Sequence, residues 1–425
     1  MKKLVIALLF LPSLAFAQPT VIKAARLFDG TSDAVIQNAV IVVDGKRIAS
    51  VGANAAIPPN ARVIDLGDAT LLPGFIDAHV HLTEQAGDNW YLDFFNEVMR
   101  QPAEEALLAT TFARKTIDAG FTTVRNVGAR DYVDVGLRNA VNNGWVVGPR
   151  MFVSVYPIGA TGGHADGSPI PPARGVQPQG PMQGVCNGVG ECREAVRYQI
   201  KYGADVIKFM PSGGVLSLAD PVDAPELSQE EMNAIVEEAH HWGRKVAAHC
   251  HGDAAARMAV QAGADSIEHG SFMRPETLAM MRERGTYLVP TLLAGDWVMR
   301  SIDKFPAPIA AKGRAAVAAR SDMFRNALKG GVKIAFGTDS AVSPHGMNAL
   351  EFALMTGLGM SPAAALRSAT SSAAALLGID DRVGSLAPGK LADIIAVPGN
   401  PLVDIHQTEH VFFVMKEGQV VKNSK

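Results

Sequence analysis

Aromatic side chains, cysteines and long apolar runs are all scarce in this chain of 425 residues. Phe, Trp and Tyr make up 6% of it, and its three cysteines form no Cys-x-x-Cys pattern, which argues against thiolate metal sites. Lys and Arg (39 residues) do not outnumber Asp and Glu (42 residues), so the formal net charge of −3 gives no basic footprint for nucleic acid. Beyond the first residues, no apolar run reaches the roughly 20 residues that a membrane-spanning helix needs. The 48% of hydrophobic residues is still enough to bury a large core.

The first 17 residues have the features of a secretory signal peptide. Lys2 and Lys3 form a basic segment, residues 4–14 form an apolar one, and Ala15-Phe16-Ala17 fits the small-x-small cleavage pattern. We therefore predict cleavage after Ala17 and a secreted or periplasmic protein; an uncleaved membrane anchor is the alternative. Removing the two lysines changes the formal net charge from −3 to −5.

The three cysteines have different expected states. In an oxidising compartment Cys186 and Cys192 can close a small loop, but the sequence leaves this open because a disulfide depends on geometry. Cys250 ends a strand pattern between two histidines, where we expect a buried, inert thiol.

Short β-rich runs at both ends of the chain predict a small β-sandwich. Asp29-Gly30 and Asp44-Gly45 interrupt the N-terminal runs, Glu417-Gly418 interrupts the C-terminal ones, and such pairs are typical of tight hairpin turns. Neither stretch is long enough to form a stable domain alone, so we expect residues 18–70 and 385–425 to fold together. The runs are residues 20–27, 39–43, 47–51, 62–66, 392–397, 411–415 and 419–421.

Between these ends, apolar strand patterns alternate with helical patterns over residues 104–119, 229–242 and 275–284. Such alternation predicts a parallel sheet with right-handed crossovers, and eight strands is the number that closes a (β/α)8 barrel. We therefore expect an α/β fold with a TIM-like barrel over residues 71–384, and a doubly wound open sheet is the alternative. The strand patterns are residues 71–78, 122–127, 151–156, 206–210, 246–248, 266–268, 287–292 and 334–336.

Residues 159–190 break this alternation. They are rich in Gly and Pro, lack periodicity and follow the third strand pattern. Long loops in compact domains are usually functional or disordered, and this one would lie on the side where barrel enzymes carry their sites.

Five side chains that can hold a metal fall at the ends of the predicted barrel strands. His79 and His81 end the first strand two residues apart, so both face the same side. His249 ends the fifth strand, His269 the sixth and Asp339 the eighth. Because the ends of parallel barrel strands converge at one face, we expect all five to meet there. Imidazole and carboxylate ligands suit zinc and similar divalent ions, so this pattern predicts a metal site.

Lys208 ends the fourth strand and can complete a site for two metal ions. A neutral lysine amine reacts with carbon dioxide to give a carbamate, an anion whose two oxygens can bridge two ions. Strand alternation turns Glu268, the neighbour of His269, to the opposite face, which leaves Lys208 as the bridging group. A buried salt bridge from Lys208 to Asp339 is the structural alternative, because buried charges are usually paired or metal-bound.

Short motifs surround these residues: GFIDAHVH at 74–81, GGH at 162–164, IK at 207–208, HCHG at 249–252, SIEHG at 266–270, GTD at 337–339 and GSLAPGKLAD at 384–393. With these motifs, essentially the whole mature chain resembles the amidohydrolase superfamily. Within it, the chain is similar to the imidazolonepropionase-related branch of secreted dipeptidases and carboxypeptidases. The departures touch no ligand position; Cys250, for example, stands where relatives more often have alanine.

The resemblance implies two divalent metal ions, zinc by the donor types, together with carbon dioxide bound as carboxylated Lys208. Two cations lower the pKa of a shared water and polarise the scissile carbonyl. One ion would be held by His79, His81 and Asp339, the other by His249 and His269, with Lys208 bridging them.

The resemblance also implies roles beyond metal binding. Asp339 would take a proton from the water and return it to the leaving nitrogen. His164, in the long loop, would contact the substrate near the reacting carbonyl, and His251 would bind substrate. Family habit further implies a homo-oligomer.

The substrate implied is a small amide or peptide. Relatives in this branch release a C-terminal amino acid from dipeptides or N-acyl amino acids, and some hydrolyse ochratoxin A to phenylalanine. Four aromatic residues in the segment 83–99 favour an apolar or aromatic C-terminal residue, or proline, if they line the mouth of the site. They can instead pack on the barrel, and Glu84 and Asp88 can instead attract a cationic side chain. The four are Trp90, Tyr91, Phe94 and Phe95.

Two other functions remain at this stage. A cyclic amidase or deaminase that uses one metal ion would not need carboxylated Lys208. A metal-binding protein without catalysis is more remote, because every ligand position is filled.

Overall fold

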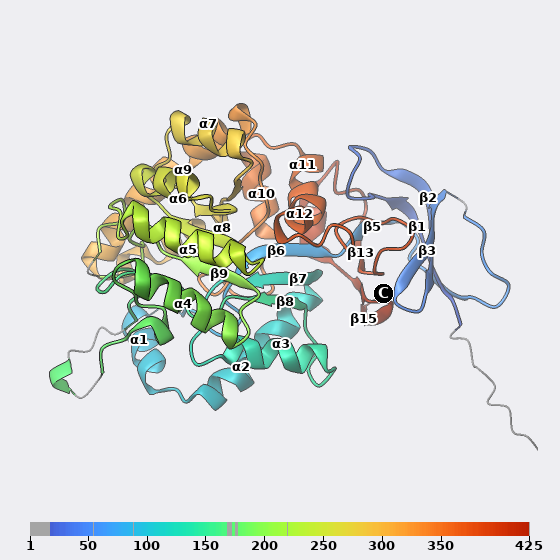
Figure 1. Ribbon diagram of the computed structural model, residues 1–425. Coiled ribbons are helices and arrows are strands. Elements are labelled where there is room, and N and C mark those ends of the chain that lie inside the picture. Colours follow the sequence, from blue (N-terminus) through green and yellow to red (C-terminus); the bar gives the residue numbers. More distant parts are fainter. Residues whose placement is uncertain are drawn as a thin grey trace, which may run out of the picture.

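The computed structural model describes residues 18–53, 55–87, 89–167, 172–174, 177–218 and 220–424. The predicted signal peptide, residues 1–17, lies outside this part of the chain. Figure 1 shows an α/β body, in which helices surround a group of strands, and a sheet on one side of it. No helix among the described residues is long and apolar enough to cross a membrane.

Strands from both ends of the described chain form one eight-stranded sheet. They are β1 (Thr20–Leu27), β2 (Ile36–Asp44), β3 (Arg47–Ala53), β4 (Arg62–Asp65), β5 (Ala69–Pro73), β13 (Ile394–Pro398), β14 (Phe413–Lys416) and β15 (Gln419–Asn423). Their order is β15-β14-β13-β5-β1-β2-β3, and β4 also pairs with β1. Because β5 and β13 are antiparallel neighbours, the two ends of the chain fold together as expected. The sheet packs its own apolar core, with Leu27, Ile41 and Phe413 among its members.

The chain passes from this sheet into the barrel at Gly74. The prediction of one strand over residues 71–78 is wrong, because β5 ends at Pro73 and β6 (Phe75–Val80) begins a separate sheet. A Cβ at Gly74 would lie 2.2 Å from Oγ1 of Thr122, so only a residue without a side chain allows this close approach.

Among the described residues, seven regular strands of the barrel lie in two parallel sheets. One holds β6, β7 (Phe121–Asn126) and β8 (Arg150–Val153); the other holds β9 (Val206–Phe209), β10 (Lys245–Cys250), β11 (Ser266–His269) and β12 (Tyr287–Val289). Single parallel bridges join them: Ile158 with Phe209, Leu288 with Ile334, and Val80 with Ser340. The expected eighth strand is therefore extended chain that bonds to β12 on one side and to β6 on the other.

Helices cover the outside of these strands (Figure 1). The helical patterns at 104–119, 229–242 and 275–284 correspond to α2 (Pro102–Asp118), α5 (Gln229–His241) and α7 (Pro275–Arg284). Ser228 caps α5, since its side chain accepts the N–H of Glu231 and its own N–H donates to the Glu231 carboxylate. The helices are α1 (Trp90–Met99), α2 (Pro102–Asp118), α3 (Val133–Asn142), α4 (Val189–Lys201), α5 (Gln229–His241), α6 (Asp253–Ala262), α7 (Pro275–Arg284), α8 (Leu292–Arg300), α9 (Ala307–Gly330), α10 (Leu350–Gly357), α11 (Pro362–Arg367) and α12 (Ala373–Leu377).

Cys186 and Cys192 form a disulfide with Cα atoms 5.0 Å apart. The pair joins the end of the long loop to the first turn of α4, where the sequence left pairing open. Val185 pairs with Gly159 in a parallel bridge, so the two ends of the loop lie side by side. Cys250 is a buried free thiol, as expected.

Candidate metal centre

His79, His81 and Asp339 meet at the carboxyl ends of β6 and the extended eighth segment. Oδ1 of Asp339 lies 3.5 Å from Nε2 of His79 and 3.3 Å from Nε2 of His81. Burial alone would raise the pKa of the Asp339 carboxyl, but the two imidazoles lower it well below its usual range. This group of two nitrogens and one oxygen can hold a divalent cation.

His249, His251 and His269 form a second group beside the first. One ligand nitrogen from each lies within 4.8 Å of the others. The ring centroid of His269 is 4.6 Å from that of His249 and 5.0 Å from that of His79, so the two groups are contiguous. Nε2 of His249 is buried and has no hydrogen-bond partner among the described residues. A bound cation would satisfy this atom.

The buried imidazoles of the second group are in the form that binds metal. Burial lowers the pKa of His249 and His269 well below the ordinary value and that of His251 to about 3, so all three are neutral at pH 7. Nδ1 of His269 lies 2.6 Å from Oγ1 of Thr291, and Nδ1 of His251 lies 2.9 Å from Oγ of Ser271. These contacts leave Nε2 of each ring for a ligand.

Lys208 lies in the barrel interior and is 1% exposed. Burial lowers the pKa of Lys208 to about 8, and the charges of Glu268 and Asp339 offset this only in part. An amine with this pKa is partly neutral near pH 8, and the neutral amine is the form that reacts with carbon dioxide. Among the described residues, the ion pairs of Asp339 join it to the two imidazoles of its own group and not to Lys208.

The prediction that Glu268 faces away from the site is wrong. Glu268 is fully buried, and its Oε2 lies 2.7 Å from Nδ1 of His79. The next residue, His269, has a φ of 69°, which breaks the strand alternation and lets both side chains reach the barrel interior. Burial alone would raise the pKa of Glu268, but the Arg125 guanidinium and His79 lower it to about 2.

His164 reaches the second group from the long loop. Its ring centroid lies 4.5 Å from that of His249. Its backbone N–H donates to the Glu226 carboxylate at 2.9 Å, and its Nδ1 lies 3.1 Å from Oγ of Ser217. A Cβ at Gly214 would lie 2.1 Å from the imidazole, so the glycine makes room for the ring. Burial lowers the pKa of His164 to about 4, which leaves a neutral ring at pH 7.

A cavity of about 190 Å³ opens beside His81 and His164. Its wall carries the charged side chains of Glu84, Glu105 and Arg130 together with apolar atoms of neighbouring residues. The wall therefore offers both charged and apolar groups to a molecule that reaches these histidines.

The aromatic residues of α1 do not belong to the described lining of this cavity. Tyr91 and Phe95 are 65% and 57% exposed, and Trp90 stacks on Phe94 with ring centroids 5.7 Å apart. These aromatic side chains therefore do not line the cavity beside His81 and His164. Asp88, the other candidate in this segment, lies outside the described residues.

Two residues that support the site were missed by sequence reasoning. Arg125 is 2% exposed, and its inward position on β7 was the available signal, because a charge inside a barrel strand needs a partner. Glu226 lies between β9 and α5, where no pattern in the sequence distinguishes it.

A family model described as the amidohydrolase family matches residues 70–423. The chain belongs to the amidohydrolase family. This membership confirms the resemblance and the α/β barrel fold that the strand–helix alternation predicted. The protein is thus a hydrolase that acts on amide bonds.

Individual relatives match this amidohydrolase over nearly its full length. The ochratoxinase of Aspergillus niger is 34% identical over 430 residues, which cover 96% of this chain and 87% of that protein. The crystal structure of a Xaa-Pro dipeptidase with bound methionine has a TM-score of 0.90 and 41% identity, covering 96% of this chain and 100% of the other. A prolidase complexed with N-methylphosphonate-L-proline has a TM-score of 0.86 and 31% identity, with coverage of 96% and 100%.

Proposed function

We propose that this amidohydrolase uses two metal ions to hydrolyse the amide bond before the C-terminal residue of dipeptides or N-acyl amino acids. The observation that carries the proposal is the contact between two groups of metal-binding side chains at the mouth of one barrel. Zinc fits the donor set, and the partly neutral amine of Lys208 can react with carbon dioxide to give a carbamate, which would supply anionic oxygen ligands.

In the proposed mechanism, His79, His81 and Asp339 would hold one ion, and His249 and His269 would hold the other. When bound, such ions would lower the pKa of a water and polarise the scissile carbonyl.

The chain's own residues then carry the proton. A carboxylate oxygen of Asp339 accepts a proton from the water, whose oxygen bonds to the carbonyl carbon. The same oxygen returns the proton to the nitrogen as the carbon–nitrogen bond breaks. The ring of His164, neutral at pH 7, contacts the carbonyl side of the substrate, and His251 contacts the part beyond it.

The preferred C-terminal residue in this proposal is apolar: Phe, Leu, Met or Pro. The relatives favour this choice, since one is a Xaa-Pro dipeptidase with bound methionine and another is a prolidase complexed with a proline derivative. The 34% identity with an ochratoxinase makes ochratoxin A, an N-aroyl phenylalanine, a further candidate. Export after cleavage at Ala17 and a homo-oligomeric state belong to the same proposal.

A mass-spectrometric screen tests this function. The purified mature protein, supplied with zinc and bicarbonate, is incubated with dipeptides, N-acyl amino acids and ochratoxin A, in parallel with a chelator control. We expect chelator-sensitive release of an apolar C-terminal residue, and the Lys208→Ala variant should lose about 10³-fold in kcat/KM because the bridging anion is absent.

Other outcomes contradict specific parts of the proposal. Release of only lysine and arginine would overturn the apolar preference. A Lys208→Ala variant with substantial activity would overturn the two-metal site in favour of a single ion. No release from any member of the library would point to a cyclic amidase or deaminase, which a library of ring substrates would detect.

A further inference from the structure

We propose that Arg125 and Glu268 form a positioning pair that holds His79 from inside the barrel. The inference rests on the proposed role of His79 as a metal ligand, and it assigns to two residues of the barrel interior a part in metal binding.

Glu268 fixes the far side of the His79 ring. Its Oε2 lies 2.7 Å from Nδ1 of His79, while Nε2 of the same ring faces Asp339 at 3.5 Å. A carboxylate on Nδ1 keeps the proton there, so that Nε2 is the unprotonated, ligand-binding nitrogen. The contact also fixes the rotation of the ring and makes the nitrogen a stronger donor.

Arg125 holds both the carboxylate and the backbone next to His79. Its Nη2 donates to Oε1 of Glu268 at 2.8 Å, and its Nε donates to the carbonyl of Ala78 at 2.6 Å. Its Nη1 donates to Oγ of Ser266 at 3.1 Å, and that hydroxyl in turn donates to Oε1 of Glu268 at 2.5 Å. One guanidinium therefore joins β6, β7 and β11 around a single metal-binding side chain.

Burial makes these contacts strong and the loss of either partner costly. Arg125 is 2% exposed and Glu268 is 0% exposed, so neither charge is solvated by bulk water. A buried carboxylate without its cation is an uncompensated charge, which the chain avoids by moving the side chain. That movement would remove the acceptor that orients His79.

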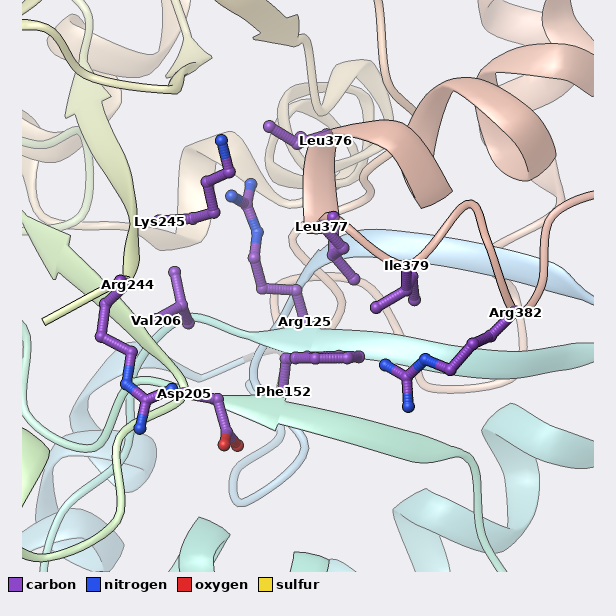
Figure 2. Close-up of a pocket in the computed structure, with 12 residues that line it drawn as sticks. Arg125, Phe152, Asp205, Val206, Arg244, Lys245, Leu376, Leu377, Ile379 and Arg382 are labelled. Carbon is purple, nitrogen blue, oxygen red and sulfur yellow. The ribbon is translucent and has the colours of Figure 1, made fainter. Parts of the chain in front are cut away.

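Figure 2 shows Arg125 in the lining of a second cavity, of about 190 Å³, together with Val206 and Lys245. Val206 and Lys245 are the first residues of β9 and β10, so this cavity lies at the amino ends of the strands. Arg125 thus separates the floor of the barrel from the residues at its mouth. Neither Arg125 nor Glu268 belongs to the lining of the cavity beside His81 and His164.

Arg150 provides a matched control, because it is also a buried arginine on a barrel strand. It is 9% exposed on β8, and its Nη1 lies 2.7 Å from the Asp393 carboxylate and 2.8 Å from Oγ1 of Thr123. None of these partners contacts a metal-binding histidine in the described structure. If Arg125 had a purely structural role, Arg125→Met would lower the stability of the protein and leave its metal affinity unchanged, as expected for Arg150→Met.

The test measures metal affinity in the purified protein by competition with a chelator, using zinc, and the visible spectrum after loading with cobalt(II). We expect Glu268→Gln and Arg125→Met to weaken binding of one metal equivalent by about 10- to 100-fold and to change the cobalt spectrum. Arg125→Lys, which keeps the charge, should recover part of the affinity. Arg150→Met should lower the melting temperature yet bind metal as the wild-type protein does.

A double-mutant cycle separates the pair from two independent effects. Because both residues act through His79, the Glu268→Gln/Arg125→Met variant should lose little more affinity than either single variant. Wild-type metal affinity and cobalt spectrum in both single variants would overturn the proposal. If the wild-type protein hydrolyses dipeptides in that case, the proposed function stands while the positioning pair falls. If the single variants bind metal weakly but the wild-type protein cleaves no amide, the positioning pair stands and the proposed function falls.

Discussion

At the scale of single residues, backbone conformation decides which side chains reach the candidate metal centre. His269 and Asp339 both have positive φ angles, 69° and 56°. Such conformations cost of order 1 kcal/mol or more for a residue with a Cβ, and they occur where the surroundings hold them in place. At His269 the result is that two adjacent residues, Glu268 and His269, both face the barrel interior.

The contribution of Glu226 to the stability of the folded protein depends on pH. Burial raises its pKa from 4.5 to about 7. Between these values the unfolded chain loses a proton that the folded chain keeps, so folding becomes less favourable as pH rises through this window. The penalty is absent below pH 4.5 and complete above about pH 7. Replacement by glutamine removes it and retains an acceptor for the N–H of His164.

We therefore predict that Glu226→Gln gains stability over the wild-type protein as pH rises. The difference in melting temperature between the two proteins should grow by roughly 1–3 °C from pH 4.5 to pH 8. Scanning calorimetry across this range measures it. Glu283→Gln on α7 is the control, because the Glu283 side chain is 70% exposed, and it should follow the wild-type pH dependence. A constant difference between wild type and Glu226→Gln would contradict the prediction.

At the scale of elements, the long loop is the segment that carries His164 to the site. Two connections anchor it: the bridge between Gly159 and Val185, and the disulfide between Cys186 and Cys192 at the start of α4. The backbone of His164 is held in addition by Glu226, 62 residues further along the chain. The position of His164 therefore depends on contacts that its own loop does not provide.

Loss of the disulfide should destabilise the protein by about 2 kcal/mol, because a short closed loop restricts the unfolded chain. We predict this effect for the Cys186→Ser/Cys192→Ser variant, measured by urea denaturation. Reducing agent should lower the stability of the wild-type protein and leave the variant unchanged. Equal responses of the two proteins to reducing agent would show that the bond contributes nothing in solution.

At the scale of the whole molecule, an ion-pair network joins the barrel to the terminal sheet. Arg150 on β8 donates to Asp393 at 2.7 Å and to Glu417 at 2.8 Å, and both acceptors belong to the C-terminal part of the chain. Asp393 also accepts the backbone N–H of Glu417 at 2.9 Å. These contacts fix the sheet against the barrel.

Breaking this network should cost about 3 kcal/mol, since Arg150→Met leaves a buried carboxylate without its cation. Urea denaturation of the full chain measures the loss. Asp404→Asn is a suitable control, because Asp404 pairs locally with Gln407 and with the backbone of His406. A change in stability no larger than that of this control would contradict the prediction.

Much of the fold and of the site could be predicted from sequence because the signals are local. Short apolar runs that are typical of buried strands end near His79, His81, His249 and His269, so local sequence alone places these residues at strand ends. The strand 71–78 was predicted wrongly because Gly74 lies within a continuous apolar run. The need for a glycine at this position is visible only in the folded structure, where the side chain of Thr122 packs against Gly74.

Local sequence is enough to name the residues of the candidate metal centre: histidines, an aspartate and a lysine, each near the end of a barrel strand. How these residues are supported follows from the folded chain. His269 joins Glu268 on the inner face because of its own positive φ angle, Arg125 joins three strands, and Glu226 holds a loop distant in sequence. The physical reason is that a strand pattern depends only on residues that are neighbours in the sequence. Hydrogen bonds between buried charges depend instead on segments that meet only when the chain has folded.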